Sequence, residues 1–217
     1  MNDGTPELVS LEARLVAQAR AGDGEAFARL VRPHLVAMHR VAGRLAGATV
    51  AEDAVQEALT LGWERLGGVR TGTPIAAFLM GFVVRRAATL ARGERRRGGR
   101  EEAHGAALSE ERPARPDELL EARRLKATIE AGLAAMPEKR RQALVLRLDG
   151  GLSDRDIAAA IDSTEGSVRV LVHQGLAELD ARLAREPAGL QPVGGVTPTL
   201  HRGAILGAPR PSPGAIP

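Results

Sequence analysis

Apolar residues recur at intervals of three and four through most of the chain, the spacing that places them on one face of an α-helix. No stretch shows the strict alternation of apolar and polar residues that is typical of a half-buried strand. The pattern predicts four helices in the first part of the chain, at residues 7–21, 25–46, 50–66 and 73–97. Four further helices are predicted at residues 117–136, 137–148, 154–161 and 165–184. The chain is therefore predicted to be all-α.

Local signals refine the boundaries of the first group of helices. Pro33 falls early in the second apolar pattern and predicts a kink or a late start of the helix there, because proline removes a backbone donor. Thr49 is a candidate N-cap for the third helix, with Glu52 at the reciprocal position of a capping box. Thr73 and Pro74 predict the start of the fourth helix, since proline is favoured at the first helical position.

The most informative stretch lies in the second group, where the sequence reads GGLSDRDIAAAIDSTEGSVRVLVHQGLAEL over residues 150–179. Two glycines end one helix, and Ser153 can cap the next, short one. A turn at residues 162–164 then offers a second cap before a longer amphipathic helix. A short helix, a tight turn and a second helix form a helix-turn-helix, whose second helix enters the major groove of DNA.

Two segments rich in glycine and proline divide the chain. Residues 98–116 lack apolar periodicity and are predicted to be a flexible linker between helical domains at 7–97 and 117–184. Seven prolines and six glycines occur in the last 31 residues, so the segment 185–217 is predicted to be a disordered tail.

Charge and composition suggest a polyanion as a partner and exclude several kinds of covalent, metal and membrane-spanning structure. Between residues 85 and 100 there are seven arginines and one acid, which suits a polyanion, although a solvated helix end followed by a linker has the same composition. The chain has no cysteine, which excludes disulfides and thiolate metal sites. It opens with no signal segment and contains no apolar run long enough for a membrane span, so it is predicted to be cytoplasmic.

No pattern of catalytic or metal-binding residues is present. His34 and His39 are five residues apart and do not share a helix face, and no acid accompanies them at ligand spacing. No phosphate-binding glycine loop or nucleophile motif occurs either. We predict that the chain is not an enzyme and uses no metal or cofactor.

Three strings together resemble the extracytoplasmic-function (ECF) class of the bacterial RNA polymerase sigma factor family. They read AEDAVQEALTLGWERL at residues 51–66, GTPIAAFLMGFVVRRAATLARGERRR at 72–97, and MPEKRRQALVLRLDGGLSDRDIAAAIDSTEGSVRVLVHQGLAEL at 136–179. The resemblance implies a region 2-type domain at 7–97, which binds core RNA polymerase and the −10 promoter element. It also implies a region 4-type domain at 117–184, which binds the −35 element. The implied function is promoter-specific initiation of transcription, with help in opening the DNA.

The resemblance assigns roles to residues on three helices. On the helix at 50–66, a polar stripe that could also be an ordinary solvated face would grip the clamp helices of the largest polymerase subunit through Asp53, Gln56, Glu57 and Thr60. The −10 element would meet Arg70, Thr71, Gly72, Thr73, Phe78, Arg85, Arg86 and Arg92, with Phe78 equally suited to core packing. The −35 element would meet Arg155, Thr164, Ser167, Arg169, Val170, His173 and Gln174.

Within the last set, Arg169 is the best candidate for a guanine contact, because a guanidinium can bind O6 and N7 together. Gln174 suits adenine or phosphate, and His173 suits phosphate or packing rather than a metal. Val170 stands where relatives often carry a small polar residue, so fewer cations face DNA than is usual in the family. Other basic residues could compensate, namely Arg155, Arg147 and the group Lys139, Arg140 and Arg141.

Other partners and functions stay open at this point. Many members of the family are inhibited by an anti-sigma protein, and the resemblance implies such a partner here. A helix-turn-helix regulator that acts without initiating transcription, or a degenerate sigma-like adaptor, would share the C-terminal pattern.

Overall fold

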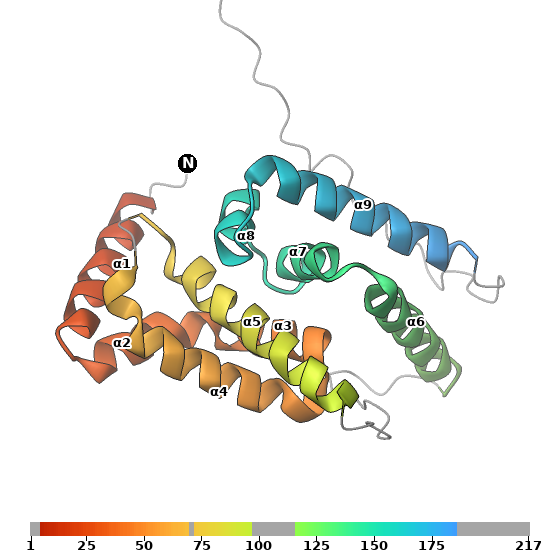
Figure 1. Ribbon diagram of the computed structural model, residues 1–217, viewed down its shortest axis with the longest axis horizontal. Coiled ribbons are helices and arrows are strands. Elements are labelled where there is room, and N and C mark those ends of the chain that lie inside the picture. The colour runs from red at the N-terminus through yellow and green to blue at the C-terminus, as the bar shows by residue number, and fades with distance from the viewer. Residues whose placement is uncertain (1–4, 70–71, 97–115, 186–217) are drawn as a thin grey trace, which may run out of the picture. The chain divides into compact units, whose positions relative to one another are not determined.

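Every element of the computed structural model is a helix or a short 3₁₀ turn within the residues it describes, which are 5–69, 72–96 and 116–185 (Figure 1). The all-α prediction is confirmed. The residues up to Arg185 form one compact unit, and the second unit, 186–217, lies outside the described residues. The predicted tail from residue 186 and most of the predicted linker, residues 98–115, also lie outside them, so the division into two domains stays a prediction.

The first five helices share a core dominated by helix–helix contacts. They are α1 (Thr5–Arg20), α2 (Gly24–Val31), α3 (Leu35–Ala46), α4 (Ala48–Glu64) and α5 (Ile75–Arg96), with 3₁₀ turns η1 (Arg32–His34) and η2 (Leu66–Gly68). Helix α3 packs against both α4 and α5, which also pack against each other. Met38, Ala54 and Leu79 are fully buried among them, as the apolar spacing of each helix requires.

The single helix predicted at 25–46 is two helices, divided at the proline where a kink or a late start was predicted, and the predicted cap at Thr49 is wrong. Pro33 lies in η1, which separates α2 from α3. Helix α4 already begins at Ala48, and its N-cap is Gly47, which makes no side-chain cap hydrogen bond. Gly47 has a φ of 92° and ends α3 as well, so a single glycine turns the chain from one helix into the next. Thr49 is therefore inside the first turn, and Glu52 accepts a hydrogen bond from Gln56 instead of closing a capping box.

The other four helices pack together, and the last two of them form the helix-turn-helix. They are α6 (Pro116–Ala135), α7 (Glu138–Leu148), α8 (Asp154–Ala160) and α9 (Glu165–Leu183). Helix α9 packs against α6, α7 and α8. Leu144, Ile157 and Val168 are fully buried where α7, α8 and α9 meet. This small core fixes the angle at which α9 leaves the turn.

Candidate nucleic-acid interface

A side-chain hydrogen bond caps each of the two helices that flank the turn, α8 and α9. Ser153 accepts a hydrogen bond from the backbone N–H of Asp156 at 3.2 Å, which caps α8 as predicted. Asp162 has a φ of 51°, a left-handed conformation that reverses the chain after α8. Thr164 then accepts from the backbone N–H of Ser167 at 3.2 Å and caps α9. The turn chemistry inferred from the sequence is thus present at the predicted residues.

The N-terminal half of α9 presents one face to the core and the other to solvent. Val168 and Val172 are buried, four residues apart, on the inner face. The outer face collects all the residues of this helix that were predicted to contact the −35 element, and each is exposed: Ser167, Arg169, Val170, His173 and Gln174. Two further predicted residues, Thr164 and Arg155, are exposed in the turn and on α8.

Side chains from α7 and α8 hold two of these outer residues. Arg140 on α7 donates to the side-chain oxygen of Gln174 at 2.9 Å and to Glu178 at 2.9 Å. Asp154, the first residue of α8, forms ion pairs with both Arg147 and Arg169, the latter at 3.7 Å. The sequence predicts no role for Asp154 at this face, and it offers Arg140 as an additional cation for DNA, not as a partner of Gln174. Asp154 lies 15 residues before Arg169, and Arg140 lies 34 residues before Gln174. The partners are on different helices, so helical spacing does not predict these contacts.

The four residues predicted to bind core polymerase lie along α4 and differ in their surroundings. Asp53 is exposed, and Gln56 is exposed and donates to Glu52 at 2.9 Å. The hydroxyl of Thr60 donates to the backbone carbonyl of Gln56 at 3.1 Å. Glu57 is half-buried and forms an ion pair with Arg86 on α5. Glu57, which was predicted to bind polymerase, and Arg86, which was predicted to bind −10 DNA, are therefore bound to each other.

The two phenylalanines of α5 pack together and against an arginine. Phe78 is half-buried and packs edge-to-face on the buried Phe82, with ring centroids 5.0 Å apart. The guanidinium of Arg85 lies 4.9 Å from the centroid of Phe82, within the range of a cation–π contact. Burial, and then the nearby charge of Arg65, lower the pKa of Arg85, whereas Asp162 opposes the shift.

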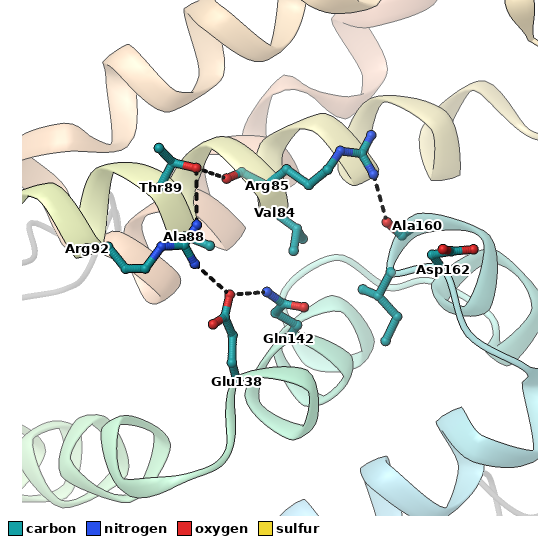
Figure 2. A pocket seen from close by; sticks show the side chains of 10 residues that line it. Val84, Arg85, Ala88, Thr89, Arg92, Glu138, Gln142, Ala160 and Asp162 are labelled. Atoms are coloured by element: carbon teal, nitrogen blue, oxygen red, sulfur yellow. Dashed lines mark hydrogen bonds and ion pairs between the residues drawn. The ribbon is translucent and has the colours of Figure 1, made fainter.

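Two arginines of α5 that were predicted to hold −10 DNA contact α7 and α8 (Figure 2). Arg92 lies 3.3 Å from Glu138, which also accepts from Gln142 at 3.1 Å. Arg85 points a terminal nitrogen at the carbonyl oxygen of Ala160, 3.5 Å away. These side chains line an open cavity of about 360 Å³, whose remaining lining comes from residues such as Val84, Ala88, Thr89, Ile161 and Asp162.

A glycine permits the close approach of α5 to the end of α8. A Cβ at Gly81 would lie 3.1 Å from the carbonyl oxygen of Ala160, which is tighter than ordinary van der Waals contact. Helix α3 adds an ion pair to this side of the molecule, between Arg44 and Asp149 at 3.3 Å. Charged groups of α3 and α5 thus bind α7 and α8 at three places.

The loop before α5 is only partly described. Arg70 and Thr71, predicted to meet the −10 element, lie outside the described residues. Gly72 is exposed with a φ of 82°, a left-handed conformation that favours glycine, and Thr73 is half-buried. The backbone N–H of Ile75 donates to Glu12 at 2.9 Å, which fixes the start of α5 against α1.

The described part of the chain offers neither a metal site nor a membrane span. No group of three or more histidine and acidic side chains there could hold a metal ion. None of the helices in residues 5–69, 72–96 and 116–185 is both long and apolar enough to cross a bilayer.

Comparison with known proteins bears on this arrangement of helices. The family "Sigma-70, region 4" matches residues 126–179, which hold the helix-turn-helix. The ECF RNA polymerase sigma factor SigD of Mycobacterium tuberculosis (strain ATCC 25618 / H37Rv) is 34% identical over 175 residues, covering 76% of this chain and 80% of SigD. The same identity and coverage hold for SigD of Mycobacterium bovis (strain ATCC BAA-935 / AF2122/97).

Two solved structures share the fold. One is CnrH in complex with the cytosolic domain of CnrY, with a TM-score of 0.61 and 24% identity, covering 81% of this chain and 99% of CnrH. The other is the sigma factor RpoE in complex with the anti-sigma factor NepR from Bartonella quintana, with a TM-score of 0.51 and 18% identity. It covers 86% of this chain and 99% of RpoE.

The fold is that of a sigma subunit of RNA polymerase. With SigD matched over most of both chains, the protein belongs to the ECF RNA polymerase sigma factors. It is a sigma factor that directs the initiation of transcription.

Proposed function

We propose that the protein divides promoter recognition between its two groups of helices. Helices α8 and α9 bind the −35 element as duplex, and α5 with the loop before it binds the −10 element while the strands open. The polar face of α4 binds the clamp helices of the largest polymerase subunit. The observation that carries the proposal is the outer face of α9, where five predicted DNA-contacting side chains are exposed together behind a capped turn.

The chemistry of α9 suits a major groove. The positive N-terminal end of its dipole favours phosphate, and Arg169 next to this end can reach a base edge. On α5, the arginines supply a basic surface for the strand, and Phe78 offers a partly exposed ring on which an unpaired base can stack. The protein needs no catalytic group of its own, because the polymerase makes the RNA.

The cellular setting and a further partner follow from the same family. We propose that the protein acts in the cytoplasm, where core polymerase and promoters are found. The two solved structures that share the fold are complexes, of CnrH with the cytosolic domain of CnrY and of RpoE with the anti-sigma factor NepR. A comparable anti-sigma protein is a proposed partner of this chain.

Transcription with purified components tests the proposal. Purified chain and core polymerase are incubated with a pool of DNA carrying randomised promoter positions, and the RNA start sites are sequenced. We expect initiation from sites that share two sequence elements separated by a fixed spacer. A regulator or adaptor would give no RNA without another sigma factor, which would overturn the proposal.

Capture of core polymerase tests the role of α4 separately. The double variant Asp53→Ala, Glu57→Ala is expected to retain less core polymerase in a pull-down than the wild type, because both carboxylates can bind basic groups on the clamp. Undiminished capture would remove α4 from the interface. Variants of the outer face of α9 serve as controls, since they are expected to leave capture unchanged.

A further inference from the structure

We propose that Asp154 is a positioning residue that holds Arg169 for one base of the −35 element and so sets part of the promoter specificity. The proposal rests on the function proposed above, in which α9 reads duplex DNA. Asp154 itself touches no base in this scheme and acts through Arg169.

The geometry assigns one carboxylate oxygen of Asp154 to each of two arginines. Oδ1 accepts a hydrogen bond from Arg147 on α7, and Oδ2 lies 3.7 Å from Nε of Arg169 on α9. Arg147 is itself held in place, because its other terminal nitrogen donates to the carbonyl of Leu152 at 2.8 Å. The carboxylate is thus fixed from the α7 side and presents its remaining oxygen to the recognition helix.

The carboxylate of Asp154 is more buried than the arginine side chain that it orients. The side chains of Arg147 and Asp154 are 24% and 27% exposed, whereas that of Arg169 is 65% exposed. An exposed arginine on a helix samples many rotamers, and fixing them on binding costs entropy. A partly buried carboxylate beside it restricts this freedom before DNA arrives.

The nitrogen that faces Asp154 leaves the end of the guanidinium available. Guanine presents O6 and N7 in the major groove, and two guanidinium nitrogens can bind them together. Because Nε faces the carboxylate, the two terminal nitrogens of Arg169 remain for this bidentate pair. Arg169 is thereby aimed by a neighbour on α8 and not by its own helix alone.

Asp154 also lies in the first turn of α8, where any carboxylate favours the positive end of the helix. Asp156 lies in the same turn and offers a matched comparison, because its carboxylate accepts from the Ser153 hydroxyl at 2.6 Å within the cap itself. Replacing either aspartate with asparagine removes one negative charge from the same helix end. Only Asp154 connects to Arg169.

The test measures base preference with the assembled polymerase. Holoenzymes formed with the wild type, Asp154→Asn, Asp156→Asn and Arg169→Ala are compared by selection on DNA randomised across the −35 element, and their affinity for an unrelated duplex is measured. We expect Arg169→Ala to abolish the preference at one position and Asp154→Asn to reduce the preference at that same position by about two- to fivefold, the range of a partly exposed ion pair. Affinity for the unrelated duplex is expected to rise slightly in both aspartate variants, because each loses a charge that repels phosphate.

Two results would overturn the role of Asp154. The first is that Asp154→Asn loses as much affinity for the unrelated duplex as for the specific DNA. The second is that Asp156→Asn loses the same base preference as Asp154→Asn. Either result would indicate a general effect on α8.

The double variant Asp154→Asn, Arg169→Ala tests whether Asp154 acts through Arg169. The aspartate change is expected to have no further effect on base preference at the shared position, and a further loss there would contradict action through Arg169. If Arg169→Ala leaves every position unchanged, the assignment of Arg169 fails, and if the wild-type holoenzyme selects no −35 sequence, the proposed function fails.

A measurement on the wild-type chain checks the contact without any substitution. The Nε proton of Arg169 is expected to exchange with solvent more slowly than that of Arg155, which is exposed on α8. Both are measured by side-chain nitrogen NMR of the full chain. Equal exchange rates would overturn the contact with Asp154.

Discussion

The guanidinium of Arg92 lies 3.3 Å from the carboxylate of Glu138, so an arginine predicted to hold promoter DNA is bound to an acid of α7. A carboxylate and a phosphate compete for the same donors of an arginine. Binding of the −10 strand by Arg92 therefore requires that this ion pair open. The two side chains are about half exposed, 49% and 47%, so the pair is screened by water and salt.

The variant Glu138→Gln is expected to bind a single-stranded −10 oligonucleotide about two- to fourfold more tightly than the wild type at low salt, because an exposed ion pair contributes up to ~1 kcal/mol. The gain is expected to shrink as salt is raised, since screening weakens the pair in the wild type. Fluorescence anisotropy with a labelled oligonucleotide measures both. Glu130→Gln is the control, because it removes the same charge from a pair with Lys126 within α6. An equal gain in the control would attribute the effect to net charge alone.

The two carboxylates of α4 are expected to respond differently to substitution. Asp53→Ala removes an exposed side chain and is expected to weaken capture of core polymerase while leaving the free energy of unfolding unchanged. Glu57→Ala breaks the ion pair with Arg86 and is expected to lower both capture and the free energy of unfolding, the latter by no more than about 1 kcal/mol because the pair is partly exposed. Urea denaturation and a pull-down of each single variant give the two quantities. Equal stability of the variants would show that the Glu57–Arg86 pair contributes nothing to the fold.

The close approach of Gly150 to α7 predicts a cost for a single added methyl group. A Cβ at Gly150 would lie 2.6 Å from the backbone carbonyl of Leu146, so the chain between α7 and α8 has to shift. Gly150→Ala is expected to lower the free energy of unfolding by roughly 1–3 kcal/mol, the usual cost of overpacking. Gly166→Ala, in the first turn of α9, meets no heavy atom within 4 Å and is expected to be neutral or stabilising by up to about 1 kcal/mol. Urea denaturation of both variants checks the contrast, and a loss at Gly166 as large as that at Gly150 would contradict it.

The half-buried His34 predicts a pH dependence of stability. Burial lowers the pKa of His34 below its ordinary value of 6.5, and the nearby Glu12 only partly offsets the shift. Between the folded pKa and 6.5 the unfolded chain binds more protons at this site, so stability is lost as the pH falls below about 6.5 and is fully present above it. The free energy of unfolding is expected to fall less steeply between pH 7 and 5.5 in His34→Gln than in the wild type. Identical slopes would show that His34 does not titrate differently in the folded protein.

Much of the fold could be predicted from local pattern. The helices at 154–161 and 165–184 were predicted within a residue of α8 and α9, because capping hydroxyls and apolar spacing act over three or four residues. The cap at Thr49 was predicted wrongly for a related reason. Gly47, which has a positive φ, is both the C-cap of α3 and the N-cap of α4. The sequence alone did not show that one glycine would serve both helices.

The candidate site could be predicted as a set of residues but not as a set of contacts. Spacing along α9 placed Arg169 and Gln174 on the outer face, since this follows from the helical period. It could not show that Asp154 and Arg140 hold them, because these partners come from other helices. Likewise, Glu57 and Arg86 were assigned to different partners and lie bound to each other.

The amino-acid sequence by itself determined the helices, the capped turn between α8 and α9 and the face of α9 that meets solvent, because each depends on residues within a few positions of one another. The tertiary structure decided which charges pair across helices: Asp154 with Arg169, Glu57 with Arg86, and Glu138 with Arg92. Such pairs depend on distances between side chains far apart along the chain, and the packing of the helices sets those distances.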